Sequence, residues 1–231
     1  MAKAKALFLT CGGHARLGGG VNQAILEEVL TGAGLETTVV PDPSGITPER
    51  LGACDVIVDY SGHAPAEPTD DQLRAVMETV AAGTPYVGLH AASLPFKSQL
   101  EYRKRLGRWP DAPEPDELLS ATQLRYFEMI GCAFITHGPI EPYRLRIVDR
   151  EHPITRGVED FEVVDELYQL GGDVARLRVL AEADGQPLLY THTWGRGRVH
   201  YNALGHDQRA LGHPSYQRLL AQAVAWALGG S

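Results

Sequence analysis

A histidine occupies a position in this sequence where many α/β enzymes carry a nucleophile. His90 lies in YVGLHAAS, residues 86–93, where a short apolar strand runs into a turn of small residues. A turn of this kind holds a serine or cysteine above the edge of the sheet. An imidazole there can act as a general acid or base near neutral pH, or as a metal ligand. The alternative is a core histidine whose ring only hydrogen-bonds a backbone carbonyl.

Two further histidines stand beside glycines at predicted strand ends. His206 follows the strand RVHYNAL, with Asp207 next to it, so two titratable groups lie at the rim of the sheet. His14 lies in the loop CGGHARLGGG after the first strand. The glycines of this loop have the spacing of neither a dinucleotide fingerprint nor a P-loop. We expect them to let the chain approach a ligand closely, with His14 facing the crevice. The alternative is a surface-loop histidine.

Acidic and aromatic groups come from the later part of the chain. Glu166 and Tyr168 lie in DELY after the strand FEVV, where two acids occur in an apolar setting. By pattern alone, solvent exposure of such a carboxylate is the more common outcome. Neutral imidazoles and a carboxylate at separate strand ends suit zinc or a similar divalent ion, although neither HExxH nor HxH spacing occurs. The candidate metal ligands are His14, His90, His137, Glu166 and His206.

The elements that must position these groups alternate between strand and helix over the first ninety residues. The first predicted helix covers residues 18–34 and is closed by Gly32 and Gly34. The second begins at Thr47, and the third begins at the capping box Thr69–Gln72 and ends at Gly83. Strands separated by such helices form right-handed βαβ units in a parallel sheet covered on both faces. Ligands bind at the carboxyl ends of the strands of such a sheet. The predicted strands are 5–10, 36–40, 55–60 and 85–89.

The strand–helix rhythm ends after His90. Residues 103–120 combine basic residues, prolines and acids, and we expect them to form an exposed insertion or lid. A helix over 118–130 follows, and from residue 143 the pattern is β-rich, with a hairpin signalled at 195–197. An amphipathic helix is predicted over 214–228. The remaining histidines of interest are predicted to be structural: His152, His192, His200 and His213.

Composition limits the classes of protein to which this chain can belong. At 231 residues it is most simply one large domain, 1–231. The formal net charge of −8 argues against binding to nucleic acid or to an anionic membrane surface. No run approaches the ~20 apolar residues of a membrane-spanning helix. Three cysteines without a CxxC pair fit a reducing compartment better than a disulfide framework, so we expect a cytoplasmic protein.

Six short stretches follow one another along the chain: Gly12–His14, Gly88–Ala92, Gly131–His137, His152–Val158, Asp165–Tyr168 and Gly195–Asp207. Together, and in this order, they resemble the ThuA-like (trehalose utilisation) family of the class I glutamine amidotransferase-like fold. The proline-rich segment 107–116 and the cysteine before the first stretch depart from the family pattern.

The resemblance implies a three-layer, flavodoxin-like α/β fold: a mostly parallel central sheet, helices on both faces and a β-hairpin extension. In true class I amidotransferases the turn carries a cysteine that pairs with a histidine from a late strand. Here His90 stands in place of the cysteine, and His206 is the late-strand histidine. This replacement argues against glutamine hydrolysis by a cysteine. Cys11 is the one candidate substitute, because Cys54 and Cys132 have the surroundings of core residues.

The family name implies a small-molecule carbohydrate substrate, a sugar or keto-sugar of the trehalose type. We predict that one crevice contains the catalytic residues His90, Glu166 and His206. A keto-sugar would allow proton abstraction next to its carbonyl, so lyase or isomerase chemistry competes with hydrolysis. The predicted substrate-binding residues are His14, His137, Tyr168 and Asp207.

Two other functions are compatible with the same residues. One is a non-catalytic sugar- or metal-binding module on an amidotransferase-like scaffold, working beside a partner dehydrogenase. The other is a metal-dependent hydrolase whose cofactor is a divalent metal such as zinc. The terminal helix and the hairpin also offer surfaces on which a homo-oligomer could form.

Overall fold

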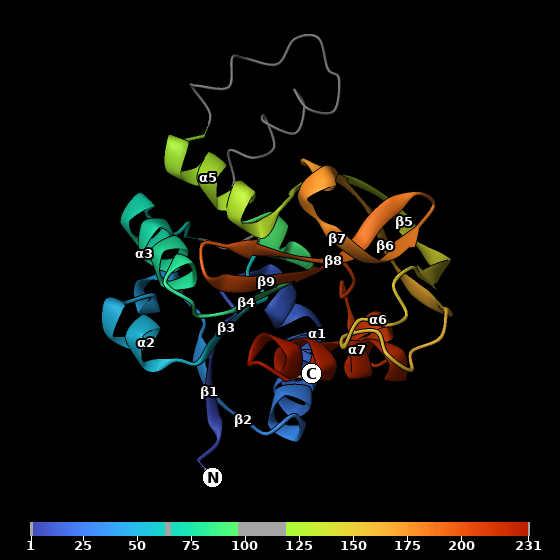
Figure 1. The fold of residues 1–231 in the computed structure, drawn as a ribbon, viewed down its shortest axis with the longest axis horizontal. Coiled ribbons are helices and arrows are strands. Elements are labelled where there is room, and N and C mark those ends of the chain that lie inside the picture. Colours follow the sequence, from blue (N-terminus) through green and yellow to red (C-terminus); the bar gives the residue numbers. More distant parts are fainter. Residues whose placement is uncertain (1, 63–65, 97–118, 231) are drawn as a thin grey trace.

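The computed structural model describes residues 2–62, 66–96 and 119–230. Its first half alternates strands and helices, as predicted (Figure 1). The short strands β3 and β4 are buried at every position, which is typical of strands covered on both faces. These elements are β1 (Ala4–Leu9), α1 (Gly13–Gly32), β2 (Leu35–Val40), the 3₁₀ turn η1 (Pro43–Gly45), α2 (Pro48–Ala53), β3 (Val56–Asp59), α3 (Asp70–Ala81) and β4 (Tyr86–Leu89).

The second half of the described chain is rich in strands, again as predicted. Within it, Gly195 and Arg196 turn the chain between β8 and β9, at the predicted hairpin. The elements are η2 (His90–Ser93), α5 (Ala121–Ile130), β5 (Ala133–Ile147), β6 (Phe161–Gly171), η4 (Val174–Arg176), β7 (Arg178–Ala183), β8 (Gln186–Trp194), β9 (Gly197–Asn202), α6 (Gln208–Leu211) and α7 (Pro214–Ala227).

The sheet is mixed, and the prediction of a mostly parallel sheet is wrong. In the described residues its order is β2-β1-β3-β4-β9-β8-β7-β5-β6. The pairs from β2 through β9 are parallel, whereas all pairs from β9 through β6 are antiparallel. The physical reason is the connections: no α-helix lies between β5 and β9 in sequence, and strands joined by short links pair antiparallel.

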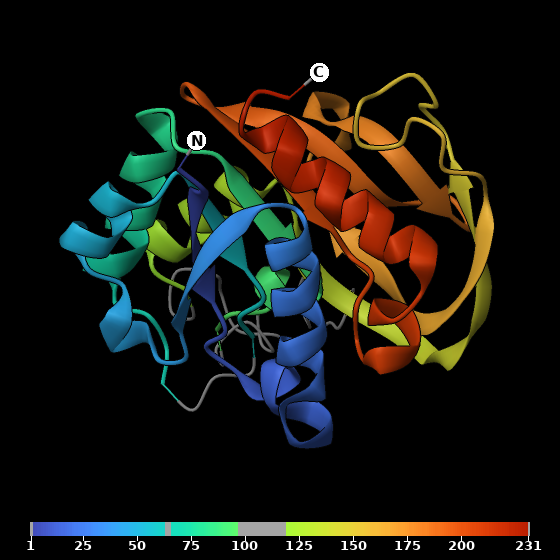
Figure 2. The ribbon, with the colours of Figure 1, turned by 90° about the horizontal axis from the view of Figure 1, so that it is seen from below.

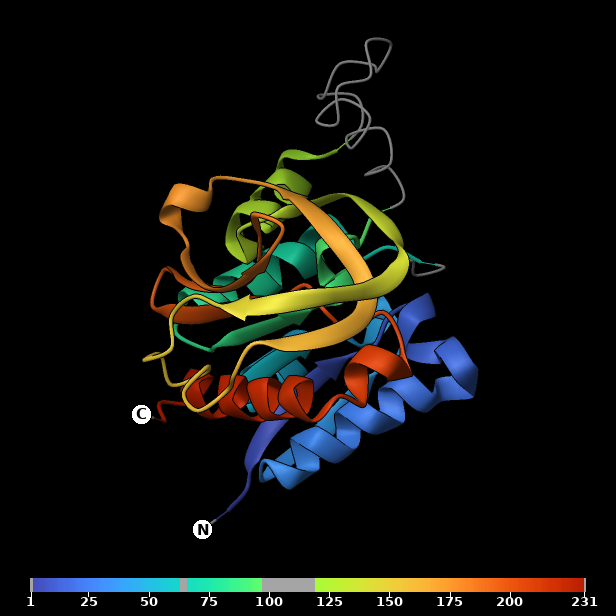
Figure 3. The same ribbon diagram turned by 90° about the vertical axis from the view of Figure 1, so that its right-hand side faces the viewer.

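Helices cover both faces of the parallel half. Helices α1 and α7 lie side by side on one face, while α2 and α3 lie on the opposite face, with α5 beside α3 (Figures 1 and 2). Figure 3 shows β5 and β6 curving away from the rest of the sheet, with α6 and α7 below them. Because β6 also contacts α6, the far end of the sheet returns to the carboxyl ends of the parallel strands.

Helix α1 begins earlier than the sequence suggests, and it is broken. Leu17 has an extended backbone, and the three glycines that follow it have φ values of 60°, 74° and 94°. Glycine adopts such positive φ values at little steric cost, so this triplet can separate a first helical turn from the main helix. That first turn, Gly13–Arg16, carries His14.

The predicted insertion or lid at 103–120 lies outside the described residues except for its last two positions. Ser120 begins α5 with a capping box, since its hydroxyl accepts the backbone N–H of Gln123 and the Gln123 side chain accepts that of Ser120. The same arrangement of Thr69 and Gln72 begins α3 and confirms the predicted helix start.

Candidate functional site

The turn after β4 holds His90 in a strained and fully buried position. Its φ is 43°, which is uncommon for a residue other than glycine, and its exposed fraction is 0%. The Nδ1 atom lies 2.8 Å from the carbonyl oxygen of Ala203 and must therefore donate a hydrogen bond. The Nε2 atom lies 2.8 Å from the hydroxyl of Tyr168. Both ring nitrogens thus have partners, and these fix the orientation of the imidazole.

Glu166 on β6 brings three imidazoles together around one carboxylate. Its Oε1 lies 3.2 Å from Nδ1 of His206 and 3.5 Å from Nε2 of His137, while its Oε2 lies 3.5 Å from Nε2 of His90. The His206 contact is within ion-pair distance but is not aligned as a hydrogen bond. These residues come from β5, β6 and the ends of β4 and β9, so segments far apart in sequence meet at Glu166.

The electrostatics of this cluster favour an ionised Glu166. Burial alone would raise the pKa of its carboxyl group, but the neighbouring His206 and His90 outweigh burial and lower that pKa. In return, the carboxylate of Glu166 raises the pKa of His206. Burial raises the pKa of Tyr168 far above its ordinary value, so this phenol keeps its proton beside His90. The cluster therefore combines a fixed negative charge with an imidazole that is more easily protonated than usual.

His14 completes a set of groups that could hold a metal ion. Its ring centroid is 5.0 Å from that of His90 and 5.2 Å from that of His206. One ligand atom from each of His14, His90, Glu166 and His206 lies within 4.8 Å of all the others. Three neutral imidazoles and a carboxylate are ligands that zinc accepts in a tetrahedral site. The bond from Nδ1 of His90 to a backbone carbonyl is also typical of metal-binding histidines.

An open pocket of about 350 Å³ lies above this cluster. That volume is in the range of small-molecule sites. One part of its lining is polar, with imidazoles and the Glu166 carboxylate, and another part is apolar. His90 does not line the pocket, because its side chain is fully buried, in contact with Glu166 and Tyr168. The lining residues are Gly13, His14, Leu17, Leu94, Phe134, His137, Glu166, Tyr168 and His206.

The structure brings six of the seven predicted site residues into this cluster and its pocket, and it leaves one aside. Asp207 begins α6: its carboxylate accepts the backbone N–H of Arg209 at 2.8 Å and pairs with the same residue's guanidinium. It does not line the pocket described above. The predicted substrate-binding role of Asp207 therefore has no geometric support here. The six that meet are His14, His90, His137, Glu166, Tyr168 and His206.

Sequence reasoning missed the apolar wall of the pocket. Leu17 is 38% exposed and directly precedes the glycine triplet, and Leu94 follows η2. Phe134 packs against Tyr168 with ring centroids 4.3 Å apart. The only available signal was their proximity in sequence to His14, His90 and His137.

The four histidines predicted to be structural have structural contacts in the described residues. His213 begins α7, with its Nδ1 accepting the backbone N–H of Ser215. His200 is buried and pairs with the carbonyl of Tyr190 at 3.0 Å, and Nδ1 of His152 accepts the N–H of Ile154. His192 lies 3.2 Å from the carbonyl of Ile130.

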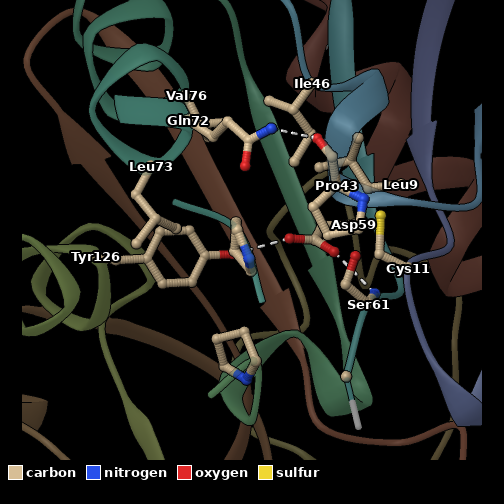
Figure 4. Close-up of a pocket in the computed structure, with 13 residues that line it drawn as sticks. Leu9, Cys11, Pro43, Ile46, Asp59, Ser61, Gln72, Leu73, Val76 and Tyr126 are labelled. Atoms are coloured by element: carbon tan, nitrogen blue, oxygen red, sulfur yellow. Dashed lines mark hydrogen bonds between the residues drawn. The ribbon is translucent and has the colours of Figure 1, made fainter. Parts of the chain in front are cut away.

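Cys11 lines a second, much smaller pocket (Figure 4). This cavity of about 30 Å³ has room for one or two water molecules but not for a sugar. Its polar end is Asp59, whose carboxylate accepts hydrogen bonds from the Tyr86 and Tyr126 hydroxyls and from the backbone of Ser61. Burial raises the pKa of the Cys11 thiol to about 12. Cys11 therefore lacks the properties of a catalytic nucleophile.

The half-parallel sheet, its helical layers and the strained turn after β4 define an α/β protein of the class I glutamine amidotransferase-like, flavodoxin-like fold. Within that class, the family model for ThuA, described as trehalose utilisation, matches residues 7–227, and the chain belongs to this family. No curated protein matches the chain in sequence. In the described residues, no helix combines the length and apolar character that a membrane crossing requires.

Solved structures with this fold include two described as putative ThuA-like proteins. That of Parabacteroides merdae is 18% identical with a TM-score of 0.73, covering 98% of this chain and 90% of that one. That of Bacteroides uniformis is 19% identical with a TM-score of 0.71, covering 97% and 91%. A cytoplasmic protein of Salmonella typhimurium LT2 is 14% identical, with a TM-score of 0.64 and coverage of 96% and 99%. At these identities the likeness concerns the fold alone.

Proposed function

We propose that this chain is a carbohydrate-processing enzyme that acts on a sugar or keto-sugar by proton transfer, without a cysteine nucleophile. The observation that carries the proposal is the contact of one buried carboxylate, Glu166, with three imidazoles beneath an open pocket. Groups that donate and accept protons near neutral pH are what general acid–base catalysis needs. Membership of the trehalose utilisation family supports the choice of a carbohydrate as substrate.

In this proposal His206 exchanges a proton with the substrate. Its side chain is 19% exposed and lines the pocket, whereas that of His90 is wholly buried. Glu166 orients the His206 ring, while the other oxygen of Glu166 lies against His90, which is itself hydrogen-bonded to Tyr168. His14 and His137 then contact substrate hydroxyls. With a keto-sugar, proton removal next to the carbonyl leads to isomerisation or to elimination of the glycosidic oxygen, and a partner dehydrogenase would supply the keto group.

The test compares turnover and binding of a keto-disaccharide in matched variants. His206→Ala is expected to lower kcat by at least about 100-fold while the sugar still binds. His213→Asn is the control, because asparagine can replace this histidine as the residue that begins α7. Unchanged kcat in His206→Ala would overturn the proposed role. Binding without any turnover by the unaltered protein would favour a sugar-binding module instead.

A second candidate function is a metal-dependent hydrolase or a metal-binding module. The observation that favours it is the set of four ligand atoms within 4.8 Å of one another in His14, His90, Glu166 and His206. A bound divalent ion would act as a Lewis acid toward a substrate oxygen. Elemental analysis of protein purified without chelator is expected to give one zinc or similar ion per chain, and far less in His14→Ala. A metal content near zero in the unaltered protein, even after incubation with Zn²⁺, would contradict this function.

A further inference from the structure

We propose that three buried side chains, Asn22, Tyr60 and Asp165, form a network that positions His206 and His14 for the chemistry at Glu166. We call them the positioning network. None of the three lines the pocket, so none is expected to touch the substrate. The inference rests on the proposed function, because it assigns these residues a role through His206 and His14.

The network fixes every backbone polar group of the dipeptide Gly205–His206. Asp165 accepts the N–H of Gly205 at 2.7 Å and that of His206 at 3.1 Å. The Tyr60 hydroxyl donates to the carbonyl of Gly205 at 2.6 Å, and the Asn22 amide donates to the carbonyl of His206 at 3.0 Å. These four contacts come from α1, β6 and the residue after β3. The backbone that carries His206 is thus held from three sides.

Such contacts matter because this segment has no regular structure of its own. It connects the end of β9 at Asn202 to the start of α6 at Gln208. A buried backbone N–H or C=O group that is not hydrogen-bonded within a sheet or helix destabilises the protein unless it finds another partner. At this position all the partners are side chains, and all three are at most 2% exposed. Removing one of them is therefore expected to loosen the loop without unfolding the neighbouring strand.

Asn22 also links the loop that carries His206 to the first turn of α1, which carries His14. The same amide nitrogen that contacts the carbonyl of His206 lies 3.0 Å from that of His14 and 3.1 Å from the Tyr60 oxygen. An amide is suited to this place because it offers two N–H donors to carbonyl acceptors. One side chain on α1 thus sets the spacing of two imidazoles whose ring centroids are 5.2 Å apart.

Two consecutive residues of β6, Asp165 and Glu166, contact different parts of His206. Asp165 holds the backbone of His206, and the carboxylate of Glu166 lies against its ring. The backbone N–H of Glu166 also donates to the Asp165 carboxylate at 2.9 Å, which ties the two residues together. A shift of the loop relative to β6 would therefore change the distance between Glu166 and His206. Errors of about 1 Å in such a distance can cost about 100-fold in rate.

The test uses two variants of the network and one matched control. Asn22→Asp keeps the shape of the side chain, but it replaces the amide nitrogen, which faces three oxygen atoms, with an oxygen that cannot donate a hydrogen bond. Tyr60→Phe removes one hydroxyl. The control is Gln222→Glu, because Gln222 donates in the same way to the carbonyls of Pro153 and Ile154, in a loop without site residues. Hydrogen exchange of the intact protein, measured by mass spectrometry, and steady-state kinetics with a keto-disaccharide are the two readouts.

Asn22→Asp is expected to speed amide exchange at least about tenfold in both 11–17 and 203–208, and Tyr60→Phe in 203–208 only. In both variants kcat falls by roughly 10- to 100-fold while KM changes little, and Gln222→Glu alters neither readout at the site. Unchanged exchange at 203–208 in both network variants would overturn the proposal. So would an equal loss of kcat in the control. Because exchange needs no turnover, it tests the network even if the proposed activity is absent.

Discussion

Gly12→Ala is predicted to destabilise the protein strongly, for a reason that is purely steric. Gly12 has φ 167°, an extended conformation that alanine adopts freely. However, a Cβ atom at Gly12 would lie 1.8 Å from the carbonyl oxygen of Gly62. The loop after β1, which contains Gly12, and the loop after β3, which contains Gly62, would have to separate by roughly 1.2 Å to bring the Cβ and the oxygen to 3.0 Å. Real Cβ atoms essentially never make contacts shorter than this.

The cost follows from what holds the two loops together. The backbone N–H of Gly13 donates to Gly62 at 3.0 Å, and that of Gly62 donates to Cys11 at 3.2 Å. Losing both costs about 1 kcal/mol each, and overpacking adds about 1–3 kcal/mol. Gly62 cannot retreat, because it already lies against Ala91, next to His90. The shift therefore falls on the turn that carries His14, so the substitution should also disturb the site.

The assay is urea unfolding, with Gly52→Ala as the matched control. The expected loss for Gly12→Ala is about 3–5 kcal/mol, or a Tm lower by roughly 10 °C. A Cβ atom at Gly52 in α2 would meet open space, so Gly52→Ala is expected to add about 0.5–1 kcal/mol through helix propensity. A free energy of unfolding for Gly12→Ala within about 1 kcal/mol of that of the unaltered protein would refute the close approach of the two loops.

Three further predictions concern groups that do not line the pocket above Glu166. Burial lowers the pKa of His200 to about 3 in the folded protein. As the pH falls below about 6.5, the histidine is therefore protonated in the unfolded chain but not in the folded one, and the folded protein loses stability. Between pH 7.5 and pH 5, the free energy of unfolding measured in urea should fall by about 2 kcal/mol more in the unaltered protein than in His200→Asn. Equal decreases in the two proteins would contradict this. Cys11, with its pKa of about 12, should resist iodoacetamide at pH 8 until the protein is denatured, as mass spectrometry can check; rapid labelling of the folded protein would disagree. Thr69→Ala should cost about 1 kcal/mol in urea unfolding because α3 loses its capping box, whereas a loss equal to that of Thr69→Ser would argue against the cap.

Local patterns predicted the elements of the parallel half well, because their signals are local. The capping box Thr69–Gln72 and the apolar runs before Tyr60 and His90 each specify an element without reference to the rest of the chain. Strand β5 shows the opposite case. It runs from Ala133, ten residues before the predicted strand at 143, through a glycine, two prolines and two register shifts. Its residues 136–142 are all exposed, so this part of the strand carries no period-two signal, and pairing with β6 determines it.

Residues of the candidate site that directly follow predicted strands could be found from the sequence. Residues that reach the site only through tertiary contacts could not. His90 and His206 stand out because each follows an apolar strand at a glycine-rich or small-residue turn. Asn22 reads as an ordinary polar residue of a helix, and its contact with His206 spans 184 positions. Asp207 follows the same strand as His206, and its short side chain begins α6 without lining the pocket. Nothing local distinguishes these two outcomes.

The central claim is that His206 transfers the proton and that the carboxylate of Glu166 is required for this transfer. The most direct measurement is the turnover of a keto-disaccharide by Glu166→Gln, compared with Glu162→Gln, an exposed position on the same strand. The account predicts that kcat falls at least about 100-fold in Glu166→Gln, with sugar binding retained, and stays unchanged in Glu162→Gln. Turnover by Glu166→Gln within about twofold of the unaltered enzyme would contradict it.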